Sequence, residues 1–283
     1  MLRTASAVRE WRTTAGTIGL VPTMGALHEG HVALVDRAIR QNDAAIVSIF
    51  VNPMQFGPHE DFAAYPRSED ADVALLEKHG VGAAFVPPVE EMYPTANGTR
   101  VVPGGIAEPL EGAARPGHFI GVATVVAKLF DIATPDRAYF GQKDFQQLRV
   151  IQTMAHDLRL ATRIVGCPIV RAPSGLAISS RNAYLSDAER TSAAALSRGL
   201  REAEQAFERG GRSADDLREL VRAELTEDGI TAEYVSCADP ITLRELSGAV
   251  DRAVVSLAAR VGGTRLIDNA LLGISLQDLD KLQ

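Results

Sequence analysis

The stretch 44–51 (AAIVSIFV) constrains the fold more strongly than any other part of the sequence, because only Ser48 interrupts its apolar run. A strand with one face in water alternates apolar and polar residues, whereas a nearly continuous apolar run is typical of a strand buried on both faces. Strands of that kind occur in parallel sheets whose two faces are covered by helices. The chain is therefore expected to contain a parallel α/β sheet.

Strand-like and helix-like patterns alternate on both sides of this run. Further strands are expected at residues 17–21, 83–86, 137–140 and 162–170, which makes about five in all. Helical patterns lie between them: up to residue 40, from a cap at Ser68 to a stop at Gly80, and at residues 121–133 and 145–158. Because each connection is long enough for a crossover, we predict an α/β fold with a Rossmann-like, doubly wound parallel sheet.

The alternation breaks near residues 171–182. Two long helices follow, and they start at the capping boxes Ser186–Glu189 and Ser213–Asp216. Strand candidates come after them at residues 233–237, 253–259 and 264–267. We therefore predict two domains, a Rossmann-like domain at residues 1–172 and a smaller α+β C-terminal lid domain at residues 173–283.

Composition and charge exclude several classes of protein. The net charge of −7, from 29 basic and 36 acidic residues, offers no basic field for nucleic acid. No apolar run reaches the ~18–20 residues that cross a bilayer, and the N-terminus lacks a hydrophobic core of the signal-peptide kind. Two cysteines, Cys167 and Cys237, cannot form a disulfide framework. We expect a cytoplasmic protein that binds neither nucleic acid nor a membrane.

The sequence 22–31 (PTMGALHEGH) lies between the first strand and the first helix, where open α/β sheets bind their ligands. His28 and His31 are three residues apart, so on a helical turn they share one face. Two imidazoles at the positive end of a helix suit a triphosphate, because they can donate hydrogen bonds and stabilise charge on phosphorus. Two other interpretations stay open: a zinc site, although H-E-x-x-H has a spacing of four, and two surface histidines.

The sequence 50–56 (FVNPMQF) follows the second predicted strand directly. Asn52 and Gln55 are neutral amides, which can hydrogen-bond hydroxyl and carboxylate groups without adding charge. An Asn-Pro turn with an incidental glutamine would look the same.

Two further motifs carry groups suited to phosphate. In residues 139–147 (YFGQKDFQQ), Lys143 can reach a phosphate and Asp144 can hold Mg²⁺. In residues 178–182 (ISSRN), two hydroxyls and the guanidinium of Arg181 can close over a phosphate chain. Taken singly, the first also fits a helix cap with a solvated lysine, and the second a loop with a capping serine.

Together and in this order, these motifs resemble the pantoate–β-alanine ligase (pantothenate synthetase) family. The matching strings extend from Pro22 to Asn182 and comprise PTMGALHEGH, FVNPMQF, the tyrosine of AYPR, GHFIGVATVVAKLF, FGQKDFQQL and SSRN. The resemblance implies ATP-dependent condensation of (R)-pantoate with β-alanine through a pantoyl adenylate, with release of AMP and pyrophosphate. It also implies the H-x-G-H nucleotidyltransferase superfamily, a requirement for Mg²⁺, a homodimer and a cytoplasmic location.

The resemblance further implies roles for individual residues. The expected catalytic residues are His31, His28, Lys143 and Arg181. The residues expected to bind ATP are Met24, Gly25, Ala26, Leu27, His28, Glu29, Gly30, His31, Gly141, Gln142, Lys143, Asp144, Val170, Ile178, Ser179, Ser180 and Arg181. Pantoate and β-alanine are expected at Gln55, Gln147, Asn52 and Tyr65, and Mg²⁺ at Asp144. The chain departs from the family pattern at two positions, because glutamate is common where Gln142 stands and methionine where Ile178 stands.

Two other functions fit part of the pattern. One is an adenylyltransferase that acts on another small acid or on a phosphate, although a phosphorylated acceptor would call for more cations than the neutral glutamines supply. The other is a regulatory protein that binds ATP without turnover, and the presence of both histidines, Lys143 and Arg181 argues against it. Pyrophosphate release that requires pantoate distinguishes the ligase from both.

Overall fold

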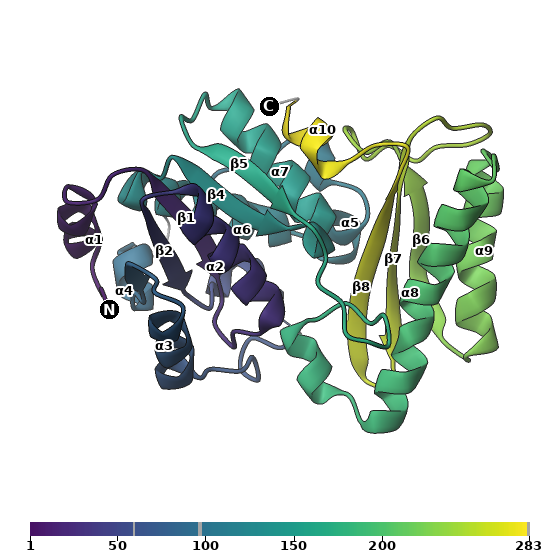
Figure 1. Cartoon of the computed structure of the whole chain (residues 1–283), viewed down its shortest axis with the longest axis horizontal. Coiled ribbons are helices and arrows are strands. Elements are labelled where there is room, and N and C mark those ends of the chain that lie inside the picture. The colour runs from purple at the N-terminus through teal and green to yellow at the C-terminus, as the bar shows by residue number, and fades with distance from the viewer. Residues whose placement is uncertain (59, 96–97, 282–283) are drawn as a thin grey trace. The chain divides into compact units, whose positions relative to one another are not determined.

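The computed structural model describes residues 1–58, 60–95 and 98–281 of the chain (Figure 1). Its contacts divide the chain into two compact units. The first unit comprises residues 1–141 and 147–167, and the second comprises residues 142–146 and 168–281. The domain boundary that we predict after residue 172 lies within the second unit. The boundary after residue 172 and the role of residues 173–283 as a lid stay predictions. The contacts define compact units, which differ from independently folding domains.

The first unit is built on a five-stranded parallel sheet with the strand order β3-β2-β1-β4-β5. Its strands are β1 (Ile18–Thr23), β2 (Ala44–Ile49), β3 (Ala83–Phe85), β4 (Arg137–Gly141) and β5 (Arg163–Cys167). This order confirms the predicted doubly wound fold, since the chain runs outward from β1 to one edge and then returns to build the other. The last strand is shorter than predicted and ends before Pro168, which has no N–H group to continue a ladder.

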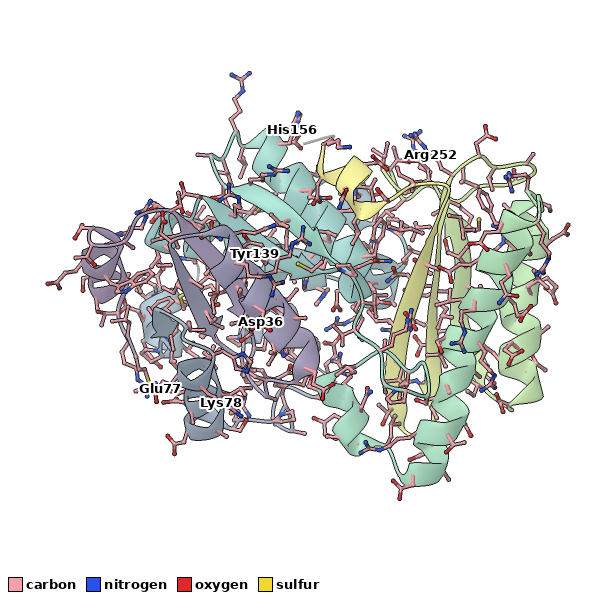
Figure 2. All side chains as sticks on the ribbon, in the orientation of Figure 1. Asp36, Glu77, Lys78, Tyr139, His156 and Arg252 are labelled. Atoms are coloured by element: carbon pink, nitrogen blue, oxygen red, sulfur yellow. The ribbon has the colours of Figure 1, made fainter. Side chains whose placement is uncertain are left out.

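Strand β2 is buried on both faces, as its apolar run predicts. Val47 lies in a core with residues of α2 (Glu29–Gln41) and α3 (Glu69–Lys78), and Tyr139 of β4 belongs to the same core (Figure 2). The neighbouring residue Ile46 points to the opposite face and is equally inaccessible to solvent. Helices therefore cover both faces of the sheet.

The remaining helices of the first unit complete its shell. They are α1 (Ala5–Arg12), α4 (Val89–Met92), α5 (Glu111–Ala114), α6 (His118–Ala133) and α7 (Phe145–Asp157), whose first two residues belong to the second unit. Helix α6 begins three residues earlier than its sequence pattern predicts, because Gly117 adopts a left-handed conformation (φ +85°) that lets the chain enter the helix there.

The second unit has a three-stranded antiparallel sheet in the order β6-β7-β8. The sheet consists of β6 (Thr231–Ala238), β7 (Ala253–Val261) and β8 (Thr264–Leu272), and it packs on α8 (Asp187–Glu208) and α9 (Ala214–Glu227). Ser186 and Glu189 form the predicted capping box of α8. Of the box predicted at α9, only one half is formed: Ser213 accepts from the N–H of Asp216. The short α10 (Leu276–Asp280) follows the sheet. Over the described ranges, no helix combines the length and apolarity that a membrane span would need.

Candidate active site

The loop between β1 and α2 makes a sharp turn before the two histidines. Gly25 and Ala26 both have positive φ, +80° and +51°, which is a conformation that an alanine rarely adopts. A side chain at Gly25 would lie 3.0 Å from the carboxylate of Asp72 and 3.1 Å from Ile49. The residues expected to bind ATP here thus occupy a tight loop, Met24–Leu27, followed by the cap and first turn of α2.

Asp72, on α3, holds this loop in place. Its two carboxylate oxygens accept from the backbone N–H groups of Ala26 and Leu27, both at 2.8 Å. The side chain is buried, with 3% of its residue exposed. Sequence reasoning missed this role, because Asp72 lies more than forty residues away and reads as an ordinary acid in the first turn of a helix.

Ser68 is the N-cap residue of α3, as predicted, but its side chain makes no capping hydrogen bond. Its hydroxyl instead donates to Asp72 Oδ1 at 3.3 Å. A carboxylate is a charged acceptor and therefore binds this hydroxyl more strongly than a neutral acceptor would.

His28 and His31 both take part in capping α2. His28 is the N-cap, and its Nδ1 accepts from the N–H of Gly30 at 3.1 Å. His31 Nδ1 accepts in turn from the N–H of His28 at 3.4 Å, and the two ring centroids lie 4.1 Å apart. Because each Nδ1 is an acceptor, the proton of each neutral ring is on Nε2. The capping bonds thereby orient both rings at the positive end of the helix and make each Nε2 a donor.

The motif FVNPMQF forms a 3₁₀ turn, η1 (Pro53–Gln55), organised by Asn52. Asn52 Nδ2 donates to Gln55 Oε1 and to the carbonyl of Gly121, both at 3.1 Å. Its Oδ1 accepts from Met54 N at 3.2 Å and from the hydroxyl of Tyr93 at 2.7 Å. Burial raises the pKa of Tyr93 to about 12, so this hydroxyl stays a donor. The amide of Asn52 is thus fully engaged within the first unit, and it orients Gln55.

Gln55 joins this turn to the histidine loop. Its Nε2 donates to the sulfur of Met24 at 3.1 Å, so residues more than thirty positions apart in the sequence are in contact. Tyr65, also buried, lies edge-on to Phe56 with ring centroids 5.8 Å apart. The structure therefore brings one predicted ATP residue against one predicted substrate residue.

Helix α6 supports the turn through a glycine and a histidine. A Cβ on Gly121 would lie 2.3 Å from the carbonyl oxygen of Met54, so only glycine allows this approach. His118 is 8% exposed and its Nδ1 donates to the carbonyl of Gln55 at 2.8 Å. Its Nε2 then accepts from Arg115, whose guanidinium also binds Glu60 at 2.6 and 2.8 Å. His118, to which the sequence assigns no role, thus holds the backbone of Gln55 in place.

The charges around His118 explain its protonation. Burial, together with the positive charge of Arg115, lowers the pKa of His118 to about 4, although the carbonyl of Gln55 and the carboxylates of Glu60 and Glu111 oppose this. Burial tends to raise the pKa of Glu60, but the hydrogen bond and charge of Arg115 outweigh it and hold that pKa below its usual range. His118 is therefore neutral at pH 7, as its two hydrogen bonds require.

Other predicted residues fall in the second unit. Lys143 and Asp144 lie in a 3₁₀ turn, η3 (Gln142–Asp144), which follows β4 and its last residue, Gly141. Val170 and Ile178 are joined by a backbone hydrogen bond of 2.9 Å, and the residues between them form a hairpin. Ser179 caps η4 (Ser180–Tyr184) by accepting from the N–H of Arg181 at 3.3 Å. Gln147, on α7, belongs to the first unit and is half-buried.

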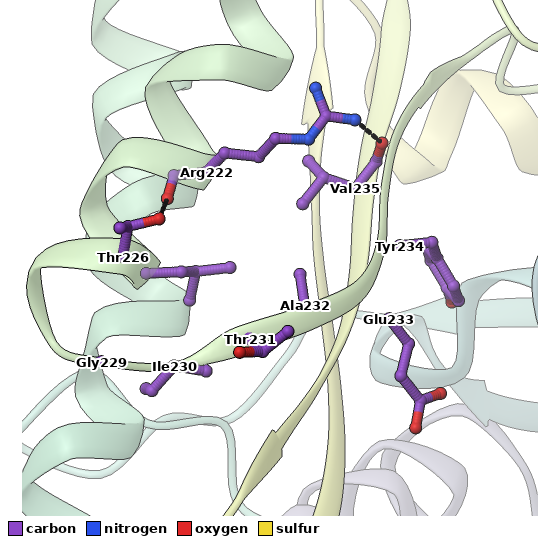
Figure 3. Close-up of a pocket in the computed structure, with 10 residues that line it drawn as sticks. Arg222, Thr226, Gly229, Ile230, Thr231, Ala232, Glu233, Tyr234 and Val235 are labelled. Atoms are coloured by element: carbon purple, nitrogen blue, oxygen red, sulfur yellow. Dashed lines mark hydrogen bonds between the residues drawn. The ribbon is translucent and has the colours of Figure 1, made fainter.

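A pocket of about 390 Å³ in the second unit lies where α9 ends over β6 (Figure 3). Arg222 crosses it and donates to the carbonyl of Val235 at 3.3 Å. None of the residues predicted for ATP, pantoate or β-alanine lines this pocket.

Comparisons with known proteins identify the family. The model of the pantoate–β-alanine ligase family matches residues 1–271. The chain belongs to this family. It is 54% identical over 276 residues to the pantothenate synthetase of Roseiflexus sp. (strain RS-1), which covers 96% of this chain and 99% of that protein. It is 52% identical to that of Chloroflexus aurantiacus over 274 residues, covering 96% and 98%. The chain is therefore an enzyme of pantothenate biosynthesis.

Solved structures of this family share the fold. The pantothenate synthetase of Thermus thermophilus superposes with a TM-score of 0.89 at 46% identity and covers 95% of this chain and 98% of its own. The pantoate–β-alanine ligase of Francisella tularensis, solved with β-γ ATP and β-alanine, has a TM-score of 0.80 at 35% identity and covers 98% and 99%.

Replacing Asp72 with asparagine should loosen the loop of this ligase. An asparagine side chain can accept from only one of the two N–H groups, and its own amide nitrogen would face the other. We expect a loss of about 1–3 kcal/mol in the free energy of unfolding and a higher KM for ATP, measured by urea denaturation and steady-state kinetics. Asp70→Asn, on the exposed face of the same helical turn, should change neither. If Asp72→Asn left the free energy of unfolding and the KM for ATP unchanged, Asp72 would not hold the loop in place.

The stability of the protein should fall as the pH decreases from about 6.5 to about 4. In that range an unfolded His118 binds a proton that the folded protein excludes, so the free energy of unfolding should decrease by about 1.4 kcal/mol per pH unit. Above pH 6.5 this contribution is complete. The measurement is urea denaturation across the range for wild type and for His118→Asn, whose amide keeps the donor to Gln55 but does not titrate.

The difference between the two slopes isolates His118 from Glu60 and the other carboxylates. His156→Asn is the control, since His156 lies on the solvent-facing side of α7 (Figure 2) and should leave the slope unchanged. Equal slopes for wild type and His118→Asn would show that His118 titrates normally.

Proposed function

We propose that this enzyme activates pantoate with ATP to pantoyl adenylate and then transfers the pantoyl group to β-alanine, with release of pyrophosphate and AMP. The observation that carries this proposal is the contact between Gln55 and Met24. It joins the turn expected to hold an acid to the loop expected to hold a nucleotide. The relative from Francisella tularensis was solved with β-γ ATP and β-alanine, which supports two of the three substrates proposed here.

The first step needs no nucleophile from the protein. A carboxylate oxygen of pantoate bonds to the α-phosphorus as the bond to the bridging oxygen of the β-phosphate breaks, and pyrophosphate leaves. Catalysis then consists of positioning and of stabilising the charge on the phosphorus oxygens. We assign the second task to His28 and His31, whose Nε2–H groups are donors at the N-terminus of α2.

Two cationic residues, Lys143 and Arg181, are also proposed to contact phosphate groups of ATP. Lys143 supplies a compact positive charge, and Arg181 a planar guanidinium suited to two phosphate oxygens. Gly141 and Gln142, the hairpin ends Val170 and Ile178, and the hydroxyls of Ser179 and Ser180 complete the set of proposed ATP contacts.

Pantoate is proposed to bind Gln55 and Gln147, and β-alanine to bind near Gln55. Asn52 acts through Gln55, because its own amide is engaged on both sides. Tyr65 is also proposed to contribute to the binding of pantoate and β-alanine. In the second step the neutral amine of β-alanine attacks the acyl carbon, the bond to AMP breaks, and the nitrogen loses a proton.

The carboxylate of Asp144 suits a magnesium ion that is also bound by the phosphates of ATP. Among the residues that the structure describes, no three His, Cys, Asp or Glu side chains gather closely enough to bind a metal. Mg²⁺ commonly binds through one or two carboxylates together with substrate phosphates, and Asp144 is exposed on its turn. We propose that Asp144 helps to hold this ion, which when bound would neutralise phosphate charge.

The decisive experiment is isotope exchange between pyrophosphate and ATP. The proposal predicts exchange that requires pantoate and proceeds without β-alanine, because the adenylate forms before the amine reacts. Exchange with another small acid but not with pantoate would indicate a different adenylyltransferase. ATP binding without any exchange would indicate a regulatory protein.

We also propose that the enzyme is a cytoplasmic homodimer, on the basis of its resemblance to the family. Light scattering after size exclusion should give about twice the 30.2 kDa of one chain. The mass of a single chain would contradict the dimer.

Replacing Lys143 with alanine should impair adenylation far more than amide formation, because the triphosphate has gone by the second step. We expect exchange to fall by about a hundredfold, while amide formation from synthetic pantoyl adenylate and β-alanine changes little. Lys78→Ala is the control, since Lys78 is exposed at the end of α3 (Figure 2). Equal losses in both steps would show that Lys143 serves folding or the second step.

Gln55→Glu should impair the use of pantoate more than Gln55→Ala. An ionised glutamate could still accept from Asn52, but it could not donate, and it would place a second negative charge beside the substrate carboxylate. In a largely buried position such repulsion is weakly screened, whereas alanine leaves space that water can fill. The measurement is the pantoate dependence of exchange at neutral pH. Normal pantoate binding by Gln55→Glu would show that Gln55 does not face the substrate.

A further inference from the structure

Asn269, on β8, is bonded to the turn that carries Lys143. Its Nδ2 donates to the carbonyls of Gln142 and Lys143 at 2.9 and 3.0 Å, and its Oδ1 accepts from Gln142 Nε2 at 3.2 Å. All of these groups belong to the second unit. Because backbone carbonyls can only accept, the orientation of the amide is fixed, with its nitrogen toward the turn and its oxygen toward Gln142.

The burial of Asn269 makes this arrangement specific. Only 3% of the residue is exposed, and a buried amide that lost these partners would incur the full cost of its desolvation. Asn269 donates to two consecutive carbonyls of η3 and thereby restrains the backbone from which the Lys143 side chain extends.

The neighbouring residue on β8 fixes a second segment. Asp268 binds the guanidinium of Arg171 at 2.6 and 3.0 Å, and Arg171 donates to the carbonyl of Gly175 at 3.1 Å. Arg171 and Gly175 lie in the hairpin that joins Val170 to Ile178, so Asp268 ties this hairpin to β8. Asp268 also accepts from the N–H of Asn269 at 2.8 Å. Two consecutive residues of one strand thus hold both second-unit segments that precede or contain proposed ATP contacts.

We propose that Asn269 is a positioning residue for the adenylation step: it sets Lys143 relative to the hairpin by tying the Lys143 turn to β8. This inference rests on the proposed function, which assigns Lys143 and the hairpin to ATP. In this chain Gln142 donates to Asn269 Oδ1, which an ionised glutamate at this position could not do.

The structural part of the proposal is tested by hydrogen–deuterium exchange of the full-length protein. In Asn269→Ala and in the isosteric Asn269→Asp, a peptide that contains residues 142–146 should exchange faster than in wild type. The aspartate variant keeps the volume, loses both N–H groups and adds a negative charge that the two carbonyl oxygens repel. Leu266→Ala, which opens the core of the second unit on the same strand, is the control and should not loosen this peptide selectively. Unchanged exchange in both Asn269 variants would overturn the inference.

The functional part is tested by separating the two steps. For both Asn269 variants, pantoate-dependent pyrophosphate exchange should fall about ten- to hundredfold, with a raised KM for ATP, because the two hydrogen bonds that Asn269 donates to the turn are lost. Amide formation from synthetic pantoyl adenylate should stay within about threefold of wild type. Leu266→Ala should affect the two steps equally. An equal loss of both steps in the Asn269 variants would show a merely structural role and overturn the inference.

The two tests separate failure of this inference from failure of the proposed function. If wild type shows no pantoate-dependent exchange, the proposed function fails, and deuterium exchange alone still decides whether Asn269 holds the turn. If the turn loosens but adenylation is normal, Asn269 restrains the turn, and its positioning role in adenylation is refuted.

Discussion

The carboxylate of Asp72 is the interaction on which the first unit's candidate site depends. Two adjacent residues of the loop have positive φ, one of them an alanine, and such a backbone persists only where its surroundings hold it. The two hydrogen bonds from Ala26 and Leu27 supply that restraint and satisfy N–H groups that the turn would otherwise leave unbonded. They also fix where α2 begins, and with it the two histidines that cap the helix.

The same principle recurs around Gln55 and in the second unit. The turns that carry two proposed site residues are each held by buried polar side chains: Asn52 and His118 at Gln55, and Asn269 at Lys143. Short turns cannot satisfy their own backbone groups, so they need such partners. Most of these partner side chains come from helices and strands. The turns can therefore present their own side chains in defined directions.

Several elements could be predicted from the sequence because their signals are local. The apolar run of β2 indicated a strand buried on both faces, and the strand-helix alternation indicated a parallel sheet; the structure and the related structures confirm both. The capping box of Ser186 and Glu189 marked the start of α8 correctly. The last strand of the sheet was predicted too long, because its apolar pattern continues past Pro168 although its hydrogen-bond ladder does not.

The sequence by itself determined the class of fold, the order of the motifs and the residue types that could bind a nucleotide and a small acid. These depend on periodicity, caps and composition over a few adjacent residues. Only the tertiary structure decided that Asp72 holds the histidine loop, that Gly121 admits the turn of Gln55, and that His118 is neutral beside it. The physical reason is that each of these depends on a hydrogen bond or close approach between residues far apart in the chain, and no local pattern specifies such a partner.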